Sequence, residues 1–185
     1  MNLNCIVLIG TGTLGGHLCK CLAESEVIEK IILFDNDIVD YKDTQVGVFQ
    51  PVDIGDYKTL ILSKRFSTYR VEIEPKTETY LDGITELPQS DLVIDCRNIF
   101  GKRDISIDIK MYINERFLIL DFQKELKNED IKKGEYHIKL EKYEIKRCAS
   151  YATDLICSNV LDDLLKSQSI KYIDIDIIQS VMLKN

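Results

Sequence analysis

Hydrophobic residues along the chain gather in short runs that polar or glycine-rich breaks separate. Residues 3–9 form a run that is hydrophobic except for Asn4 and is followed by Gly10, which is typical of a strand buried on both faces of a parallel sheet. Residues 13–23 follow with hydrophobic positions at helical spacing, and residues 30–35 form a second buried run. A strand, a crossover of helical length and another strand predict a βαβ unit.

The same alternation of strands and helices continues through the middle of the chain. Hydrophobic spacing predicts helices at residues 57–66 and 102–114. Further strands are predicted at residues 69–73, 91–96 and 116–122. Strands that alternate with helices predict the α/β class, here a Rossmann-like, mostly parallel sheet with helices on both faces.

The pattern changes after the last of these strands. Residues 123–135 form a charged connector. Residues 136–145 and 171–181 alternate hydrophobic and polar positions, which predicts strands or a hairpin with one face in water. Residues 152–167 between them have the spacing of a helix. We expect one domain in two parts: a Rossmann-like region, residues 1–122, and a C-terminal antiparallel extension, residues 123–185.

Charge and composition narrow the classes of partner. The 185 residues include 24 Lys and Arg against 31 Asp and Glu, a net charge of −7, which does not suit a protein that binds the phosphate backbone of nucleic acid. No hydrophobic run reaches the length of a membrane span, and the start of the chain lacks the pattern of a secretion signal. We therefore expect a cytoplasmic protein that binds neither nucleic acid nor membrane.

Six cysteines are present, but they do not have the spacing of a metal site. No two of them form a Cys-x-x-Cys pair, and His17 lies far from His137 in the sequence, so a tetrahedral zinc site has little support. We expect reduced thiols and assign no residue as a metal ligand.

The first strand leads into a glycine loop that is typical of nucleotide-binding proteins. Gly10, Gly12 and Gly15 have the Gly-x-Gly-x-x-Gly spacing between a strand and a helix, where backbone N–H groups and the helix dipole favour phosphate. Asp35 ends the second strand, where a carboxylate can accept hydrogen bonds from ribose hydroxyls. These residues predict a nucleotide site, and they leave NAD, FAD and ATP as alternatives.

Segments beyond the loop resemble the ThiF/MoeB family of ubiquitin-activating-enzyme-like adenylyltransferases. The segment LFDNDIVDYKDTQ, residues 33–45, is similar to the end of the family's second strand, and DIGDYK, residues 53–58, to its Asp-x-Gly-x-x-Lys stretch. DLVIDCRNIFGKRD, residues 91–104, is similar to the fourth strand and the loop after it, and residues 148–166 are similar to a late helix.

The resemblance implies a chemistry and a set of site residues. Family members bind MgATP and the C-terminal glycine carboxylate of a partner, and they form an acyl-adenylate. The implied partner is a small ubiquitin-like or peptide protein, the cofactor is ATP or AMP with Mg²⁺, and a homo- or heterodimer is expected. The residues implied in cofactor binding are Gly10, Gly12, Gly15, Asp35, Asp37 and Lys58, and those implied in catalysis are Lys58 and Asn98.

Several positions depart from the family pattern. Asp43 and Val46 stand where the family has Asn and Arg, and Asn98 stands at the position of its magnesium aspartate. Because loss of one preorganised charge costs on the order of a hundredfold in rate, these departures favour a degenerate, non-catalytic or partner-dependent subunit that still binds an adenine nucleotide.

Two other functions remain open. One is an active ATP-dependent adenylyltransferase, in which Arg97 or Arg103 replaces the lost cations, Asp37 or Asp95 reaches a metal, and Cys148 accepts the activated partner. Burial of Cys148 at the start of a helix is the simpler interpretation of that residue. The other function is an NAD-dependent oxidoreductase, for which the two histidines offer little support.

Overall fold

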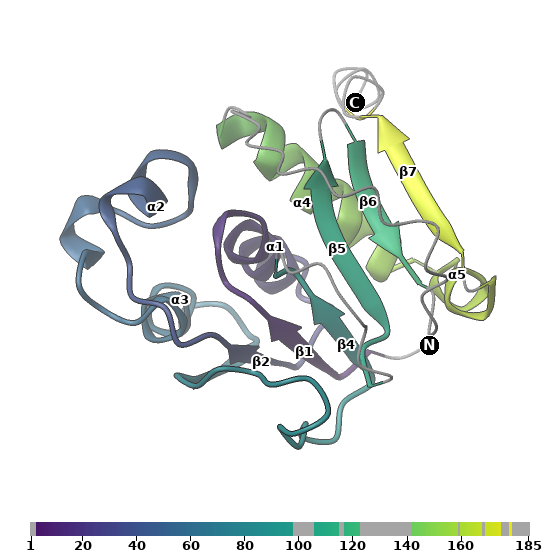
Figure 1. The fold of residues 1–185 in the computed structure, drawn as a ribbon, viewed down its shortest axis with the longest axis horizontal. Coiled ribbons are helices and arrows are strands. Elements are labelled where there is room, and N and C mark those ends of the chain that lie inside the picture. The colour runs from purple at the N-terminus through teal and green to yellow at the C-terminus, as the bar shows by residue number, and fades with distance from the viewer. Residues whose placement is uncertain are drawn as a thin grey trace.

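A seven-stranded β-sheet forms the centre of the computed structural model (Figure 1). The structure describes residues 3–97, 106–114, 117–122, 142–158, 160–167, 169–174 and 178. The strands lie in the order β3-β2-β1-β4-β5-β6-β7. Their bounds are β1 Cys5–Ile9, β2 Lys30–Phe34, β3 Glu72–Lys76, β4 Leu92–Asp95, β5 Ile109–Asn114, β6 Phe117–Asp121 and β7 Ile170–Asp174.

Two kinds of strand pairing meet in this sheet. β1 is parallel to β2 and β4, β2 is parallel to β3, and β4 is parallel to β5. β6 is antiparallel to both β5 and β7. The register places Val7 at the centre, between Ile32 and Val93, as expected for strands that are hydrophobic along their whole length. The predicted α/β class, with a mostly parallel sheet and a C-terminal antiparallel extension, is confirmed.

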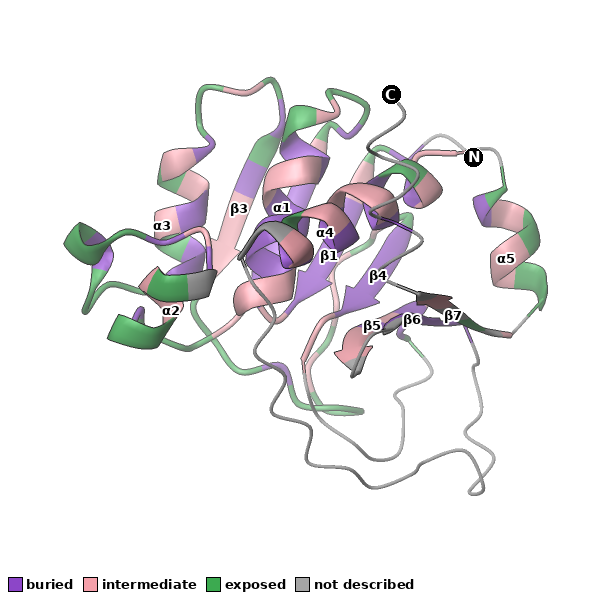
Figure 2. Ribbon diagram, turned by 90° about the horizontal axis from the view of Figure 1, so that it is seen from above, coloured by how far each residue is buried: buried purple, intermediate pink, exposed green. Residues whose placement is uncertain are grey.

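The described helices differ in length and in what they cover. Helices α1, α3 and α4 lie on the same side of the sheet (Figure 2). None of the helices in the described part of the chain has both the length and the hydrophobicity that a membrane span needs. Their bounds are α1 Thr13–Glu24, α2 Tyr41–Val46, α3 Lys58–Arg65, α4 Lys142–Ile156 and α5 Leu161–Ser167, with a short 3-10 helix at Pro51–Asp53.

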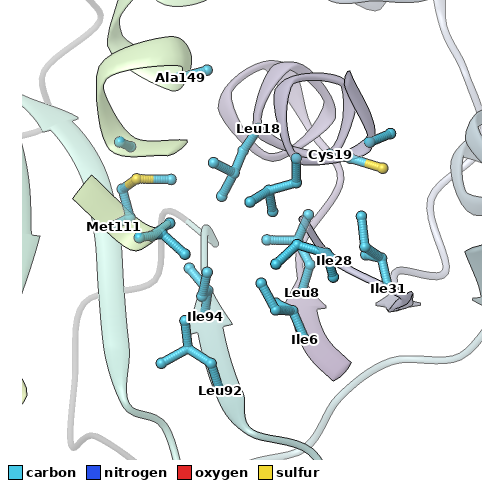
Figure 3. Packing of buried hydrophobic residues seen from close by; sticks show 14 of the residues in the cluster. Ile6, Leu8, Leu18, Cys19, Ile28, Ile31, Leu92, Ile94, Met111 and Ala149 are labelled. Atoms are coloured by element: carbon cyan, nitrogen blue, oxygen red, sulfur yellow. The ribbon is translucent and has the colours of Figure 1, made fainter. Parts of the chain in front are cut away.

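The larger hydrophobic core lies between the sheet and these helices. Leu18 and Ala149, from α1 and α4, pack over side chains that include Leu8, Ile94 and Met111, and all five are fully buried (Figure 3). Full burial of one such large hydrophobic side chain contributes about 1.5–3 kcal/mol. The core therefore joins the parallel strands to β5 and α4.

A smaller cluster covers the other face of the sheet. Val7, Ile9 and Phe34 from the strands pack there with Tyr80 from the loop between β3 and β4. The rings of Phe34 and Tyr80 meet edge to face, with their centroids 6.3 Å apart. The sequence analysis expected helices on both faces, but among the described residues loop side chains cover this face, and the helical side chains belong to the larger core.

Two predictions in the middle of the chain are wrong. The helix predicted at residues 102–114 is strand β5 over Ile109–Asn114, and residues 102–105 lie outside the described part. Ile109 and Met111 are both buried in the larger core and Ile113 packs against it, which is the two-residue spacing of a strand, and β5 pairs with β4 and β6. The strand predicted at residues 69–73 begins later, at Glu72, and is β3.

Two predictions in the C-terminal part also need correction. The alternation at residues 136–145 predicted a strand, but residues 142–145 are the first turn of α4, and residues 136–141 lie outside the described part. The single helix predicted at residues 152–167 is two helices, because α4 ends at Ile156 and α5 begins at Leu161. The helices predicted at residues 13–23 and 57–66 are confirmed by α1 and α3.

Candidate functional site: the glycine loop and two paired cations

The glycine loop connects β1 to α1 at the carboxyl end of the parallel strands. Gly10 has a φ of +85°, a conformation that favours glycine. A Cβ on Gly15 would lie 1.9 Å from the carbonyl oxygen of Gly10, whereas a Cβ on Gly12 would have no atom within 4 Å. The lack of a side chain at Gly15 therefore lets α1 pack closely against the Gly10 carbonyl, and Gly12 faces open space at the N-cap of that helix.

Asp35, which follows the end of β2, stabilises this loop by accepting hydrogen bonds. Its Oδ2 accepts hydrogen bonds from the backbone N–H of Thr11 at 2.6 Å and from the Thr11 hydroxyl at 2.8 Å. Its Oδ1 accepts one from the backbone N–H of Asp37 at 2.9 Å. An ionised carboxylate has about four acceptor positions, so the described bonds leave one for a ligand hydroxyl, on Oδ1.

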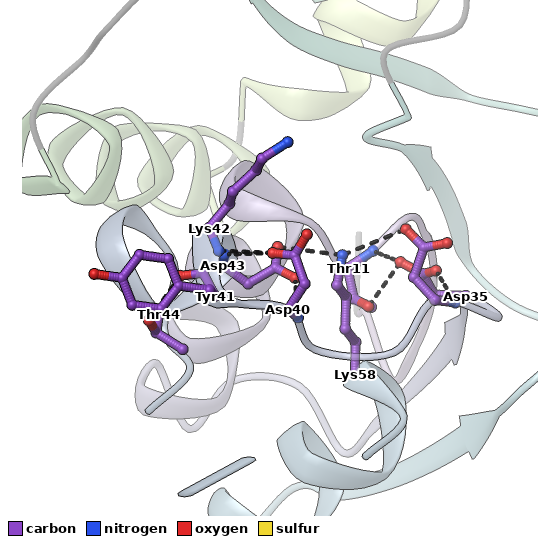
Figure 4. Close-up of polar contacts among 9 residues, drawn as sticks. Thr11, Asp35, Asp40, Tyr41, Lys42, Asp43, Thr44 and Lys58 are labelled. Atoms are coloured by element: carbon purple, nitrogen blue, oxygen red, sulfur yellow. Dashed lines mark hydrogen bonds and ion pairs between the residues drawn. The ribbon is translucent and has the colours of Figure 1, made fainter. Parts of the chain in front are cut away.

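Lys58 begins α3 and points into a group of carboxylates next to the loop (Figure 4). Its Nζ lies 3.2 Å from Oδ1 of Asp43 and 3.3 Å from Oδ2 of Asp37. The side chain of Lys58 is only 8% exposed. Burial by itself lowers the pKa of Lys58, but the charge and hydrogen bond of Asp43 and the charges of Asp37 and Asp35 outweigh it, so the pKa is raised.

Asp43 is fixed by the start of α2, a helix that the sequence analysis did not predict. The side chain of Asp40 accepts hydrogen bonds from the backbone N–H groups of Lys42 and Asp43. Oδ2 of Asp43 accepts one in return from the N–H of Asp40 at 3.0 Å. This reciprocal capping holds Asp43 so that its other oxygen meets Lys58. The Asp-x-x-Asp spacing of residues 40–43 was the available sequence signal.

Arg97, which follows β4, is a second cation beside the glycine loop that forms ion pairs with aspartates. Its Nε lies 3.0 Å from Oδ1 of Asp95, and its Nη2 lies 3.0 Å from Oδ2 of Asp95 and 2.7 Å from Oδ1 of Asp82. Nη1 donates to the carbonyl oxygen of Tyr80, and the guanidinium lies 5.0 Å from the centre of the Tyr80 ring. A Cβ on Gly10 would lie 2.9 Å from Cγ of Arg97.

The structure thus brings most of the predicted site residues together. The glycine loop contains Gly10, Gly12 and Gly15, and Asp35 is hydrogen-bonded to it. Asp37 and Lys58 contact each other beside this loop. Asn98 and Arg103 lie outside the described residues, and nothing is described of the Val46 side chain. The contact between Lys58 and Asp43, fifteen residues apart on different helices, was not predicted from the sequence.

Two residues that were considered as metal ligands are engaged with cations instead. Asp37 contacts Lys58, and Asp95 is bonded to Arg97. Over the ranges given above, no group of three or more His, Cys, Asp or Glu residues is arranged to hold a metal ion.

Cys148 lies inside α4 rather than at the start of a helix. It is fully buried, and burial is the main reason that the pKa of its thiol is raised to about 12. Because the thiolate is the nucleophile, this environment opposes the idea that Cys148 accepts an activated partner.

Comparison with known proteins identifies the family. A model of the ThiF family matches residues 3–132, well over half of the chain. The chain belongs to the ThiF family. The matched residues contain the glycine loop, the Lys58 group and the Arg97 group, so this ThiF-family chain carries both paired cations within the family region. The resemblance seen in the sequence is confirmed.

Solved structures show the same fold at low sequence identity. Escherichia coli MccB with succinimide superposes with a TM-score of 0.63 and 14% identity, over 93% of this chain and 64% of that chain. E. coli MccB with AMPCPP and MccA gives 0.59 and 16%, over 83% and 56%. PaaA gives 0.58 and 15%, over 83% and 54%. The ThiF-family chain therefore spans less than two thirds of these proteins. Comparison with curated protein sequences gave no match.

Proposed function

We propose that this chain binds an adenine nucleotide and acts as a non-catalytic or partner-dependent subunit in the activation of a ubiquitin-like or peptide partner. The observation that carries the proposal is the ion pairing of Lys58, whose ammonium group is held between Asp37 and Asp43. The neighbouring loop has a positive φ at Gly10 and open space beside Gly12. Residues 1–122 supply the nucleotide site, and residues 123–185 extend the same domain.

The glycine loop and Asp35 support nucleotide binding. Gly12 is the N-cap of α1 and has no side chain to cap the first-turn amides, and the space beside it is open. Amides at a helix N-terminus attract phosphate because the helix dipole is positive there. Oδ1 of Asp35 accepts one hydrogen bond, from the N–H of Asp37, and has a further acceptor position for a ribose hydroxyl. The residues present therefore fit a nucleoside phosphate.

The two cations next to the loop support a reduced catalytic role. Transfer of an adenylyl group to a carboxylate needs positive charge where negative charge develops. Lys58 is neutralised by two carboxylates, and Arg97 is bonded to Asp95, Asp82 and the Tyr80 carbonyl. Both cations are thus already paired within the chain, which favours binding without turnover.

The relatives suggest what the partner is like. A solved structure of E. coli MccB contains MccA, and one contains both AMPCPP and MccA. By analogy, a peptide or small protein is the partner of this chain, and we expect the chain to act as a homo- or heterodimer. The structure with AMPCPP also favours a second candidate, an active adenylyltransferase in which the partner or a second subunit supplies the missing cations.

Binding of adenine nucleotides to the full chain, measured by isothermal titration calorimetry, tests the proposal. Wild-type protein is expected to bind at least one of adenosine, AMP and ATP. Gly12→Ala should weaken the binding of AMP and ATP, because its new Cβ meets no protein atom but enters the proposed phosphate position, and it should lower the midpoint of thermal unfolding only slightly, by the cost of Ala at an N-cap. Failure of wild-type protein to bind any of the three compounds contradicts the proposal.

Pyrophosphate exchange separates the two candidates. A non-catalytic subunit produces no exchange between labelled pyrophosphate and ATP with Mg²⁺, whether alone or with a ubiquitin-like or peptide partner that lacks its own activating subunit. Exchange that depends on such a partner supports the active adenylyltransferase instead.

A further inference from the structure

The charge around Lys58 has a consequence for the kind of nucleotide that the site accepts. We infer that the site takes adenosine or its monophosphate in preference to the triphosphate, because Asp43 and Asp37 already hold the Lys58 ammonium group. This inference rests on the proposed nucleotide binding and goes further, to the number of phosphates.

The first step is the balance of charge in the group. Two carboxylates, of Asp37 and Asp43, lie 3.3 Å and 3.2 Å from the single ammonium group of Lys58. The group therefore carries a net negative charge. An added anion has to approach these carboxylates or displace one of them, and a like charge placed beside a ligand charge weakens binding even in partly screened surroundings.

The second step concerns which carboxylate can move. Asp37 is 64% exposed, so water screens its ion pair with Lys58. Asp43 is 14% exposed, and the reciprocal capping with Asp40 at the start of α2 fixes its backbone and one of its oxygens. Asp43 is therefore the residue that keeps Lys58 from a phosphate.

The third step concerns other cations near the loop. Arg97 is bonded to two aspartates and to a carbonyl oxygen, and its release would break both side-chain bonds to the buried Asp95. Lys42 is on the same helix as Asp43, but its side chain extends away from Lys58 (Figure 4). Neither residue offsets the charge that each further phosphoryl group adds, whereas the amides of the glycine loop suffice for one phosphate.

Titration of the full chain with adenosine, AMP and ATP, first without divalent cations, tests the inference. We expect wild-type protein to bind AMP about tenfold or more tightly than ATP. Asp43→Asn retains a side-chain oxygen for the helix cap but removes the charge, and it should raise ATP affinity by about tenfold while AMP affinity changes less. Circular dichroism of the variant verifies that it is folded.

Two further variants make the assignment specific. Asp56→Asn removes the same charge from an exposed residue in the segment before α3, which makes no ion pair with another described residue, and it should leave the ratio of ATP to AMP affinity within about twofold of wild type. Adding Lys58→Met to Asp43→Asn should remove the gain in ATP affinity, because the gain requires the released ammonium group.

The outcomes distinguish this inference from the proposed function. If wild-type protein binds ATP as tightly as AMP, or if Asp43→Asn does not raise ATP affinity, the preference inferred here is wrong although nucleotide binding stands. If Mg²⁺ makes ATP the tighter ligand of wild-type protein, the carboxylates serve a metal ion and the inference is again overturned. If no adenine compound binds to wild-type protein or to Asp43→Asn, both the inference and the proposed function fail.

Discussion

Lys58 and Arg97 both lie beside the glycine loop and both contact two aspartates, yet the two cations are held very differently. Arg97 uses Nε, Nη1 and Nη2 at once and reaches both oxygens of Asp95, which is 1% exposed. Lys58 makes one contact with each of its carboxylates, and one of these, Asp37, is 64% exposed. The planar guanidinium suits a fixed, bidentate contact, whereas an ammonium group is a compact charge on a flexible stem.

The difference separates a structural cation from one that a ligand or a mutation can redirect. Arg97 joins the end of β4 to the loop that covers the smaller hydrophobic cluster, through the carbonyl of Tyr80 and through Asp82. Lys58 joins α3 to α2 through side-chain charge, while its backbone N–H donates to the carbonyl of Asp37. We therefore expect Arg97 to contribute mainly to stability and Lys58 mainly to the choice of ligand.

Of the variants proposed here, Arg97→Met should have the largest effect on stability. Removal of the guanidinium leaves the buried carboxylate of Asp95 without its bidentate partner, and Lys110 at 4.0 Å is a weak substitute. Loss of one member of a buried ion pair costs about 3–5 kcal/mol. Chemical denaturation monitored by circular dichroism should show a fall of that size in the free energy of unfolding.

Two controls show whether the buried pair is responsible. Asp82→Asn removes an aspartate that is 39% exposed and should cost less than about 1 kcal/mol. The double variant Asp95→Asn with Arg97→Met removes both charges and should be more stable than Arg97→Met alone. A loss from Arg97→Met no larger than that from Asp82→Asn would mean that Arg97 is not the structural cation.

Lys58→Met should have a smaller effect on stability. Met keeps much of the hydrophobic stem, and the two carboxylates that lose their partner are reached by water to different extents, Asp37 more than Asp43. We expect a loss of about 1–2 kcal/mol in the free energy of unfolding, measured as for Arg97. Asp37→Asn is the matched control and should cost less than about 1 kcal/mol. Equal losses from Lys58→Met and Arg97→Met would remove the distinction between the two cations.

The parallel half of the fold could be predicted from the sequence because its signals are local. Continuous hydrophobic runs marked β1, β2 and β4, and the glycine spacing between two of them located the nucleotide loop together with Asp35. Each of these features depends on residues within one βαβ unit.

The errors in the predicted elements arose where the two-residue period of a strand and the 3.6-residue period of a helix occur close together. Residues 107–113 alternate Ile, Ile, Met and Ile with polar or aromatic residues, a period of two that favours a strand, and β5 is that strand. In α4 the buried positions Ile145, Cys148, Ala149 and Ala152 have helical spacing, but alternation in the preceding residues obscured the start of that helix. A window that compares both periods at each position would have located both elements.

The ion pairs of the site could not be predicted from the sequence. The sequence supplied Asp43 and Lys58 as residues, but their contact depends on α2, whose six residues give a weak helical pattern, and on the turn that returns the chain to α3. Asp95 and Arg97 are two residues apart, yet their bonding also involves the distant Tyr80 carbonyl. Contacts of this kind depend on how separate elements pack.

The smallest expected effect is a difference in how the two cations respond to alkaline pH. Burial lowers the pKa of Lys58, but Asp43 and Asp37 outweigh burial, so its folded pKa is raised above the ordinary value of 10.5. The stabilisation from Lys58 is therefore complete below pH 10.5 and is lost as pH rises through the folded pKa. The pKa of Arg97, which burial lowers, is nevertheless raised by hydrogen bonds with Asp95 and Asp82 from a value that is already far above this range.

Unfolding of wild-type protein, Lys58→Met and Arg97→Met at about pH 8 and about pH 11 measures this difference. Because cysteines and tyrosines titrate in all three proteins, the informative quantity is the difference in the free energy of unfolding between wild type and each variant. We call this difference the gap. The gap for Lys58→Met should narrow at the higher pH, since the unfolded wild-type chain loses the Lys58 proton before the folded one does and wild type is destabilised. The gap for Arg97→Met should stay constant, because the guanidinium remains charged. If both gaps narrow to the same extent, loss of the Lys58 proton is not the cause of the narrowing. Alkaline pH then acts on residues that surround both cations.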